Sequence, residues 1–241
     1  MNSNQGLLSD IKNQNLIFQR ELKSKKNKVA YVLLDSKPRV VKLFLPGYKN
    51  NLQNEYNVLK KGYSKLNVPT PFEIDNKNNI LILSYISGTN LCDVINSDKK
   101  EGFNNPEILR LLAIWFFKFH EFFKTDNYHI IRGDSSLRNF IYNTQIWGVD
   151  FEESRKGKPE EDIAEMCVSI LTTDPMFTAD KVKLCKKFIS FYEDISKKKL
   201  TKIETEISYS LLNKIQFREN QSDIFKKYAT QIREKGLDSF S

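Results

Sequence analysis

The hydrophobic pattern of this chain changes near residue 86, and that change constrains the fold more than any other feature. Before residue 86, β-rich segments alternate with turn residues, and one stretch around Leu52, Tyr56 and Leu59 has helical spacing. The segments expected as strands are 15–19, 28–34, 40–45, 72–74 and 80–85. Turn residues over 35–38 and 75–79 join four of these segments into two hairpins. The pattern predicts a five-stranded antiparallel sheet with one helix.

After Gly88 the apolar residues recur mainly at helical spacing. Strands and loops are expected only over 128–151. The predicted helices are about 107–123, 160–171, 178–195, 200–217 and 222–235. Segregated strands and helices indicate an α+β fold with two parts. We place the β-rich N-terminal part at 1–86 and the helical C-terminal part at 87–241.

Composition excludes several classes of protein. The 241 residues are 40% hydrophobic, with 9 Gly and 7 Pro, which is typical of a folded globular chain. Three widely spaced cysteines form no CxxC pair, so neither a disulfide framework nor a zinc site is expected. The N-terminus lacks an apolar signal core, and the apolar run over 111–117 is too short to span a membrane. A cytoplasmic protein is expected.

The net charge of +8 suggests an anionic partner. Residues 181–241 hold 14 Lys or Arg against 8 Asp or Glu, so most of the surplus lies in the C-terminal helices. An anionic partner could bind there, or the lysines could simply be solvated. Nucleic acid is less favoured, because the chain has no RNA-binding motif and no basic surface interleaved with aromatic residues.

The segment 129–153 carries the residues with the clearest chemical roles. Asp134 follows Gly133, Asn139 lies five residues further on, and Asp150 ends an apolar stretch over 146–149. A carboxylate beside a hydroxyl group can accept its proton. An Asn and an Asp at the ends of neighbouring strands can hold Mg²⁺, which prefers oxygen ligands.

This pattern resembles the protein-kinase-like phosphotransferases, and above all their compact branches. Those branches are the aminoglycoside and choline phosphotransferases, the lipopolysaccharide sugar kinases, and the atypical RIO/Bud32-like protein kinases. The resemblance implies a two-lobed fold that binds ATP and Mg²⁺. It implies that Asp134 orients the acceptor hydroxyl as the catalytic residue. Asn139 and Asp150 would bind the metal, and Asn139 would also belong to the catalytic loop.

Further residues fit the resemblance in the expected order. It implies that Lys42, on a predicted strand, contacts the nucleotide phosphates and that Glu55, on the next helix, holds it in place. Backbone groups near Tyr85 and Ile86 would read adenine. Asp162 would support the catalytic loop from the helix that follows it.

Three positions depart from the family pattern. Asp150 is followed by Phe151 and Glu152, where the family has Phe-Gly, which predicts a fixed rather than a switching metal-binding loop. The link between the first two strands, 22–28, lacks glycine, so the Ser24 hydroxyl, backbone amides and lysines would cover the phosphates. Arg132 stands where the family usually has His, two residues before the catalytic Asp. We group Arg132 with Asp162 as support for the loop, and a contact of Arg132 with phosphate or substrate is the alternative.

Only eleven residues separate Asp150 from Asp162, which leaves no room for the activation segment of regulated protein kinases. Helices after Asp162 favour an acceptor pocket for a small hydroxylated compound, such as a sugar-like molecule. The basic C-terminal quarter favours an anionic or neutral acceptor. Two alternatives stay open: an atypical RIO/Bud32-like Ser/Thr protein kinase, and a non-catalytic ATP-binding pseudokinase that acts as a scaffold.

Overall fold

The chain forms two compact units in a computed structural model that describes residues 15–24, 26–97 and 106–240. The first unit is the described part of Met1–Ser87 together with the short segment Val149–Glu153. The second unit is the described part of Gly88–Gly148 and Ser154–Ser241. The chain therefore returns to the first unit for five residues, at the point where Asp150 lies.

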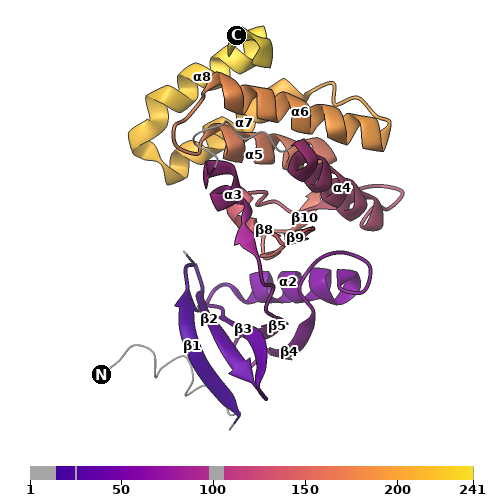
Figure 1. Cartoon of the computed structure of the whole chain (residues 1–241), viewed down its shortest axis with the longest axis vertical. Coiled ribbons are helices and arrows are strands. Elements are labelled where there is room, and N and C mark those ends of the chain that lie inside the picture. Colours follow the sequence, from indigo (N-terminus) through magenta and orange to yellow (C-terminus); the bar gives the residue numbers. More distant parts are fainter. Residues whose placement is uncertain (1–14, 25, 98–105, 241) are drawn as a thin grey trace. The chain divides into compact units, whose positions relative to one another are not determined.

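The first unit contains the five-stranded antiparallel sheet that the sequence predicts (Figure 1). The strand order across the sheet is β1-β2-β3-β5-β4. The strands are β1 (Leu16–Leu22), β2 (Lys28–Leu34), β3 (Lys37–Leu43), β4 (Pro71–Asp75) and β5 (Ile80–Ser84). Alternate residues of β2, β3 and β5 form a buried apolar cluster on one face of the sheet: Ala30, Val32, Val41, Ile80 and Ile82.

The turn between β2 and β3 is shorter than the sequence pattern suggests. Asp35 and Ser36 have φ angles of 50° and 61°, so these two residues alone reverse the chain. Lys37 and Pro38 already belong to β3, and Pro38 pairs with Leu33 of β2. The longer β3 sets the register that carries Lys42 to the buried end of the strand.

One long helix, α2 (Lys49–Gly62), accompanies the sheet and packs against β4 and β5. Its buried side includes Leu52, Val58 and Leu59, which follow the helical spacing seen in the sequence. Glu55 lies on the same buried side. A fully buried carboxylate on an apolar helix face needs a partner that is charged or donates hydrogen bonds.

The second unit is mainly helical and contains strands of two or three residues around a 3₁₀ turn. Its helices are α3 (Leu91–Ser97), α4 (Pro106–Phe122), α5 (Pro159–Leu171), α6 (Ala179–Ser196), α7 (Ile203–Lys214) and α8 (Ser222–Lys235). Its short strands are β6 (Thr89–Asn90), β7 (His129–Ile131), β8 (Phe140–Tyr142), β9 (Ile146–Gly148) and β10 (Arg155–Gly157). The 3₁₀ turns are Leu137–Asn139, Ile215–Phe217, Glu219–Gln221 and Leu237–Phe240. The predicted helix over 200–217 is thus a shorter helix, α7, followed by a 3₁₀ turn.

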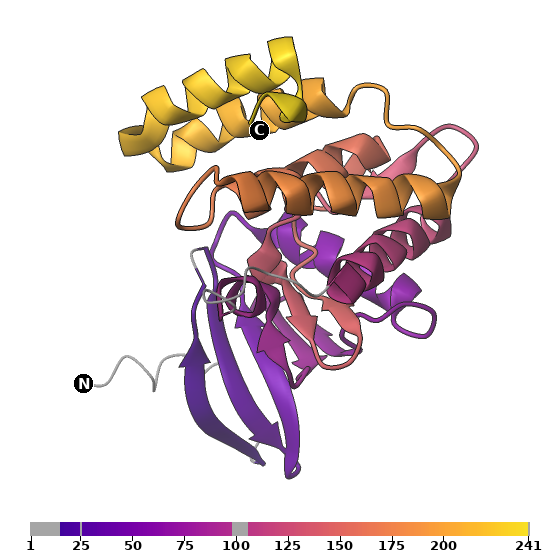
Figure 2. The ribbon, with the colours of Figure 1, turned by 45° about the horizontal axis from the view of Figure 1, so that its top comes forward.

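The helices of the second unit pack around an aromatic core. Helix α4 packs on α6, α5 packs on α7, and α7 packs on α8 (Figure 2). Phe116, Phe119 and Phe140 are fully buried, and Trp115 stacks on Phe119 with ring centroids 5.3 Å apart. This core holds the segment between β7 and β8, where the sequence motif lies. Among the helices that the structure describes, none combines the length and the apolar character needed to cross a bilayer.

Candidate functional site

A buried lysine in the first unit binds two carboxylates at once. Lys42 Nζ on β3 lies 2.6 Å from Glu55 Oε2 on α2 and 2.7 Å from Asp150 Oδ1. Glu55 has no solvent exposure and Lys42 is 7% exposed, whereas the side chain of Asp150 is 37% exposed. The three residues that the sequence assigned to nucleotide and metal binding in this unit therefore meet at one point.

The electrostatics of this cluster keep the lysine charged. Burial alone would lower the pKa of Lys42, but the charges of Glu55 and Asp150 outweigh burial and raise that pKa. The ammonium group is thus a permanent cation at the edge of the sheet. Glu55 is held wholly by the protein, and Asp150 is the carboxylate that also reaches solvent.

The segment after Asp150 adds a third carboxylate that our sequence analysis did not single out. Glu152 is buried, and its carboxylate accepts a short hydrogen bond from the side chain of Asn27. Burial, with the neighbouring charge of Asp150, raises the pKa of Glu152 to about 7. Carboxylate oxygens of Glu55, Asp150 and Glu152 lie within 4.8 Å of one another. The run Asp-Phe-Glu-Glu after the apolar strand was the signal that could have identified Glu152.

These oxygens suit a hard divalent cation such as Mg²⁺. Carboxylate oxygens of three residues gather here in a small volume, and such oxygens are the ligands that Mg²⁺ prefers. Asp150 has a φ of 65°, an uncommon conformation for a residue other than glycine. Such a conformation at a polar residue is frequent where a chain presents a side chain for function.

The glycine-free link between β1 and β2 is tied to this same segment. Asn27 binds Glu152, and Lys26 forms an ion pair with Glu153. The Ser24 hydroxyl accepts a hydrogen bond from the Asn27 N–H over 3.3 Å, so it shapes the turn. Lys25 lies outside the described residues. Side-chain contacts thus anchor a loop that contains no glycine.

The two residues expected near adenine follow β5 directly. Tyr85 and Ile86 are half-buried and follow Ser84 outside any helix or strand. The Tyr85 ring lies against the Tyr31 ring of β2, with centroids 4.5 Å apart. This ring contact holds the segment against β2. The backbone of Tyr85 and Ile86 does not belong to a strand of the sheet.

In the second unit, the motif around Asp134 forms a tight loop between β7 and β8. Gly133 has a φ of 73°, which lets the backbone turn sharply before Asp134. Asn139 folds back on the loop, and its Nδ2 donates to the Asp134 carbonyl over 3.1 Å. This bond uses the amide nitrogen of Asn139, so the amide oxygen is the atom suited to a cation. Asp134 and Asn139 are therefore held in a defined mutual geometry.

A buried aspartate supports this loop from helix α5. Asp162 is 1% exposed and accepts hydrogen bonds from the backbone N–H of Arg132 at 2.8 Å and of Gly133 at 3.2 Å. The Ser135 hydroxyl donates to the same carboxylate over 2.9 Å. Burial alone would raise the pKa of Asp162, but its hydrogen bond with His120 and these backbone N–H groups lower it. Asp162 thus binds the backbone of the loop that carries Asp134.

Two further residues of α5 support the loop, and our sequence analysis missed both. Glu165 accepts a hydrogen bond from the Ser135 N–H over 2.7 Å. Ser169 Oγ accepts one from the Leu137 N–H over 2.9 Å. Asp162, Glu165 and Ser169 are spaced three and four residues apart, which places them on one face of the helix. Polar residues at this spacing in a mostly apolar helix were the available signal.

Arg132, two residues before Asp134, is buried in the second unit. Its side chain is fully buried, with the guanidinium 4.7 Å from the Phe140 ring centroid and 5.5 Å from that of Trp115. Its Nη2 lies 3.4 Å from the Asp134 carbonyl. A fully buried guanidinium that lies against two aromatic rings does not reach solvent, so Arg132 packs beneath the loop.

Several solved structures have a fold similar to that of this chain. The ethanolamine kinase of Plasmodium vivax matches with a TM-score of 0.64 and 13% identity, over 90% of this chain and 80% of that chain. An amicoumacin kinase, solved with AMP-PNP, Ca²⁺ and Ami, matches with a TM-score of 0.64 and 12% identity, over 100% and 98%. The gentamicin complex of APH(2″)-IIa matches with a TM-score of 0.59 and 13% identity, over 100% and 98%.

The chain thus has the protein-kinase-like fold in the form found in compact phosphotransferases. No family model matches the sequence, and no curated protein sequence matches it either. At these identities the likeness establishes the fold, and the function has to be argued from the residues.

Proposed function

We propose that this chain is an ATP- and Mg²⁺-dependent phosphotransferase that moves the γ-phosphoryl group of ATP to a hydroxyl of a small acceptor. The observation that carries the proposal is the contact of Lys42 with both Glu55 and Asp150. A buried permanent cation beside a half-exposed carboxylate suits a polyphosphate together with its divalent cation. A purely structural ion pair would not need the third residue, Asp150, in an uncommon backbone conformation.

The polar residues of the site then have distinct roles in the proposed reaction. Lys42 neutralises charge on the α- and β-phosphates, and Glu55 holds Lys42 in place. Asp150 and Asn139 would hold Mg²⁺, and the bound cation neutralises charge that develops on the phosphates. Backbone groups of Tyr85 and Ile86 bind adenine.

Asp134 acts on the acceptor. It orients the acceptor hydroxyl and accepts its proton. The hydroxyl oxygen forms a bond to the γ-phosphorus while the bond from that phosphorus to the β–γ bridging oxygen breaks. ADP leaves with the electron pair of the broken bond, and the proton passes from Asp134 to solvent.

The short connection after the metal-binding segment supports a small acceptor. Strand β10 follows Asp150 by five residues and pairs with β7, and α5 begins at Pro159. The strand and the helix use the residues that would form a peptide-binding activation segment in regulated kinases. Helices α6, α7 and α8 then supply material for an acceptor pocket. A cytoplasmic location, where ATP is available, belongs to the same proposal.

The test is the substitution Asp134→Asn. We expect transfer to fall by about 10²–10⁴-fold, because the amide cannot accept the hydroxyl proton. The affinity for Mg-ATP should change by less than about threefold, because the substitution leaves Lys42 and Asp150 intact. ADP release with a panel of sugars, amino alcohols, aminoglycosides and a generic protein substrate measures the first quantity, and calorimetry measures the second.

Asp126→Asn, at an exposed aspartate of the loop after α4, is the matched control and should keep full activity. Full transfer activity in Asp134→Asn would contradict the proposal. Transfer to the protein substrate alone would favour the RIO/Bud32-like alternative. Binding of Mg-ATP without turnover on any acceptor would favour the pseudokinase alternative.

A further inference from the structure

The second unit contains a polar cavity of about 310 Å³ beside the catalytic loop. Its described lining comes from α3, the loop, the end of α5 and the turn after α7. Arg138, Lys214 and Arg218 contribute three cations, and Asp174 is the one carboxylate among the described lining residues. The cavity therefore carries an excess of positive charge. Its volume lies at the lower end of the roughly 300–1,000 Å³ of small-molecule sites, which favours a compact ligand.

The cavity is connected to the loop that carries Asp134. Ser136 and Arg138 line it from the loop, and Ser169 lines it from α5. The same Ser169 hydroxyl accepts the N–H of Leu137, so one hydrogen bond joins the cavity wall to the loop. A ligand in this cavity lies against residues two and four positions after Asp134.

Glu165, which supports the loop from helix α5, is affected by a charge of the loop and by a charge of the cavity. Burial raises the pKa of Glu165; the charge of Asp134 raises it further, whereas the charge of Lys214 lowers it.

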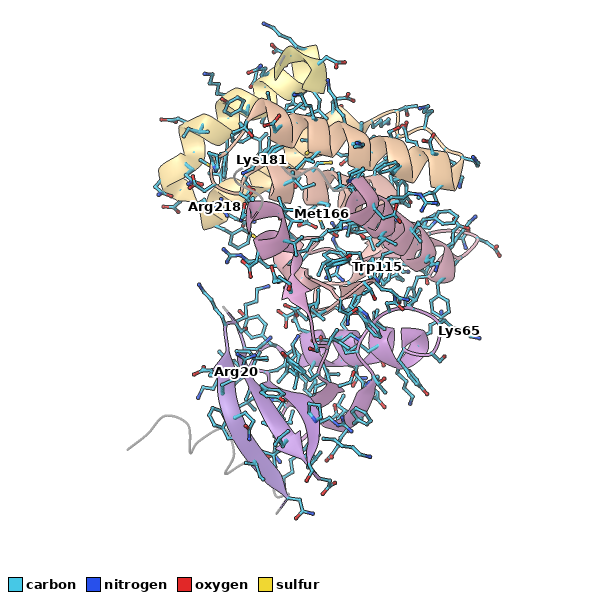
Figure 3. All side chains as sticks on the ribbon, in the orientation of Figure 1. Arg20, Lys65, Trp115, Met166, Lys181 and Arg218 are labelled. Carbon is cyan, nitrogen blue, oxygen red and sulfur yellow. The ribbon has the colours of Figure 1, made fainter. Side chains whose placement is uncertain are left out.

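The part of the cavity wall over 172–175 is held by two basic residues, Arg218 and Lys181. Both lie at the same end of the helical unit (Figure 3). Arg218 Nη1 donates to the Thr172 carbonyl over 3.1 Å, and its other described acceptor is the neutral side chain of Gln221. Lys181, from α6, donates to the Pro175 carbonyl over 2.6 Å and also to the Thr173 carbonyl. The wall over 172–175 is thus held by hydrogen bonds, and the acceptors described for Arg218 carry no charge.

We propose that this cavity binds the acceptor, and that the acceptor is a small anionic hydroxyl compound such as a polyol bearing a phosphate or a carboxylate. Lys214 and Arg218 bind the anionic group, and Arg138, Ser136 and Ser169 supply further polar contacts. The acceptor hydroxyl is then presented to Asp134. This inference rests on the proposed function and adds to it the charge of the acceptor. Ethanolamine and gentamicin, the compounds named for two proteins of the same fold, are cations and would be disfavoured here.

The experiment measures acceptor binding to the whole protein saturated with Mg-AMP-PNP by calorimetry. The probes are ribose 5-phosphate and gluconate as anions, ribose as the neutral compound, and ethanolamine and gentamicin as cations. We expect at least one anion to bind about tenfold or more tightly than ribose, and the cations to bind more weakly than ribose. Ribose 5-phosphate and gluconate together distinguish a phosphate from a carboxylate.

Three variants test the residues involved. Lys214→Gln should weaken binding of the preferred anion by about tenfold, and Asp174→Asn should strengthen it by about two- to fivefold because a like charge is removed. Lys226→Gln, at an exposed lysine of α8, should change it less than twofold. Since Arg218 also holds the wall, Lys214 and Asp174 are the primary variants, and Mg-AMP-PNP affinity verifies that each is folded.

Preference for ethanolamine or gentamicin, or equal behaviour of Lys214→Gln and Lys226→Gln, would overturn the inference. ATP turnover on a cationic or neutral acceptor would then leave the proposed function standing. Conversely, binding of an anion that depends on Lys214 without any turnover would support the cavity while removing the phosphotransferase assignment.

Discussion

Lys42 illustrates how one buried charge can define a site. An ammonium group at 7% exposure would be strongly destabilising alone, and the two carboxylates offset that penalty. Of these, Glu55 is fully enclosed, whereas Asp150 remains accessible to solvent. The cluster is therefore satisfied within the protein and still offers a charged face to a ligand.

Glu165 gives a pH dependence of stability with a definite sign. Burial, with the charges of Asp162 and Asp134, raises its pKa from 4.5 to about 8, so the folded protein holds a proton that the unfolded chain releases near pH 4.5. The protonated group therefore favours the fold at low pH. This contribution is lost as the pH rises from about 4.5 to about 8. The free energy of unfolding falls over that range by on the order of 2–4 kcal/mol.

Urea unfolding of the wild type and of Glu165→Gln between pH 5 and 8.5 measures this effect. We expect the unfolding free energy of the variant to fall less over that pH range than that of the wild type, since glutamine stays neutral and still accepts the N–H of Ser135. Glu73→Gln, at an exposed residue of β4, is the control and should decline like the wild type. Identical curves for the wild type and Glu165→Gln would refute the assignment.

Helix α5 supports the loop that carries Asp134. Asp162, Glu165 and Ser169 accept backbone N–H groups of the loop along one helix face. Most other residues of the helix are buried and apolar, so the helix is fixed in the core of the second unit. The position of Asp134 therefore depends on the rigidity of α5.

Asp162→Asn tests this support. The amide retains one acceptor oxygen but faces backbone N–H donors with its own N–H₂ group, which leaves buried donors unsatisfied. We expect a loss of unfolding free energy of about 2–4 kcal/mol and a lower kcat, with Mg-ATP affinity unchanged within about threefold.

Urea unfolding, steady-state kinetics and calorimetry provide these three quantities. Glu160→Gln, two residues earlier on the same helix, should stay within about 0.5 kcal/mol of the wild type. A variant that is as stable and as active as the wild type would show that the loop holds its shape without Asp162.

In the whole molecule, the residues proposed to bind the nucleotide and those proposed to act on the acceptor belong mainly to different units. Lys42, Glu55, Asp150 and Glu152 belong to the first unit, together with Tyr85 and Ile86. Asp134, Asn139 and the basic cavity belong to the second unit. This division predicts that nucleotide binding and acceptor binding can be impaired separately.

Asp150→Asn should raise the Kd for Mg-ATP by about tenfold or more, because a carboxylate ligand of the cation becomes a neutral amide. Calorimetry in the presence of EDTA should show little difference between the variant and the wild type, and affinity for the anionic acceptor probe should be retained. Glu73→Gln again serves as the control. Equal Mg-ATP affinity in Asp150→Asn and wild type would exclude Asp150 as a metal ligand.

The order of elements and the identity of several polar residues could be predicted from the sequence. Alternation and helical spacing are local properties, so the five strands and most of the helices were recognisable, whereas helix α3 was not predicted. Turn chemistry at Asp35 and Ser36 also moved one strand boundary. Asp134, Asn139 and Asp150 were singled out by the chemistry of their side chains and by their spacing along the chain. Lys42 and Glu55 were singled out only through the resemblance to a known family.

The tertiary structure decided what depends on contacts between distant segments. Arg132 is buried against the rings of Trp115 and Phe140, and no local pattern records that enclosure. Glu152 joined the carboxylate cluster because the chain returns to the first unit over Val149–Glu153. The basic cavity combines side chains from α3, the catalytic loop and the turn after α7, more than a hundred residues apart. Sequence determines which charges a chain carries, whereas packing determines which of them meet.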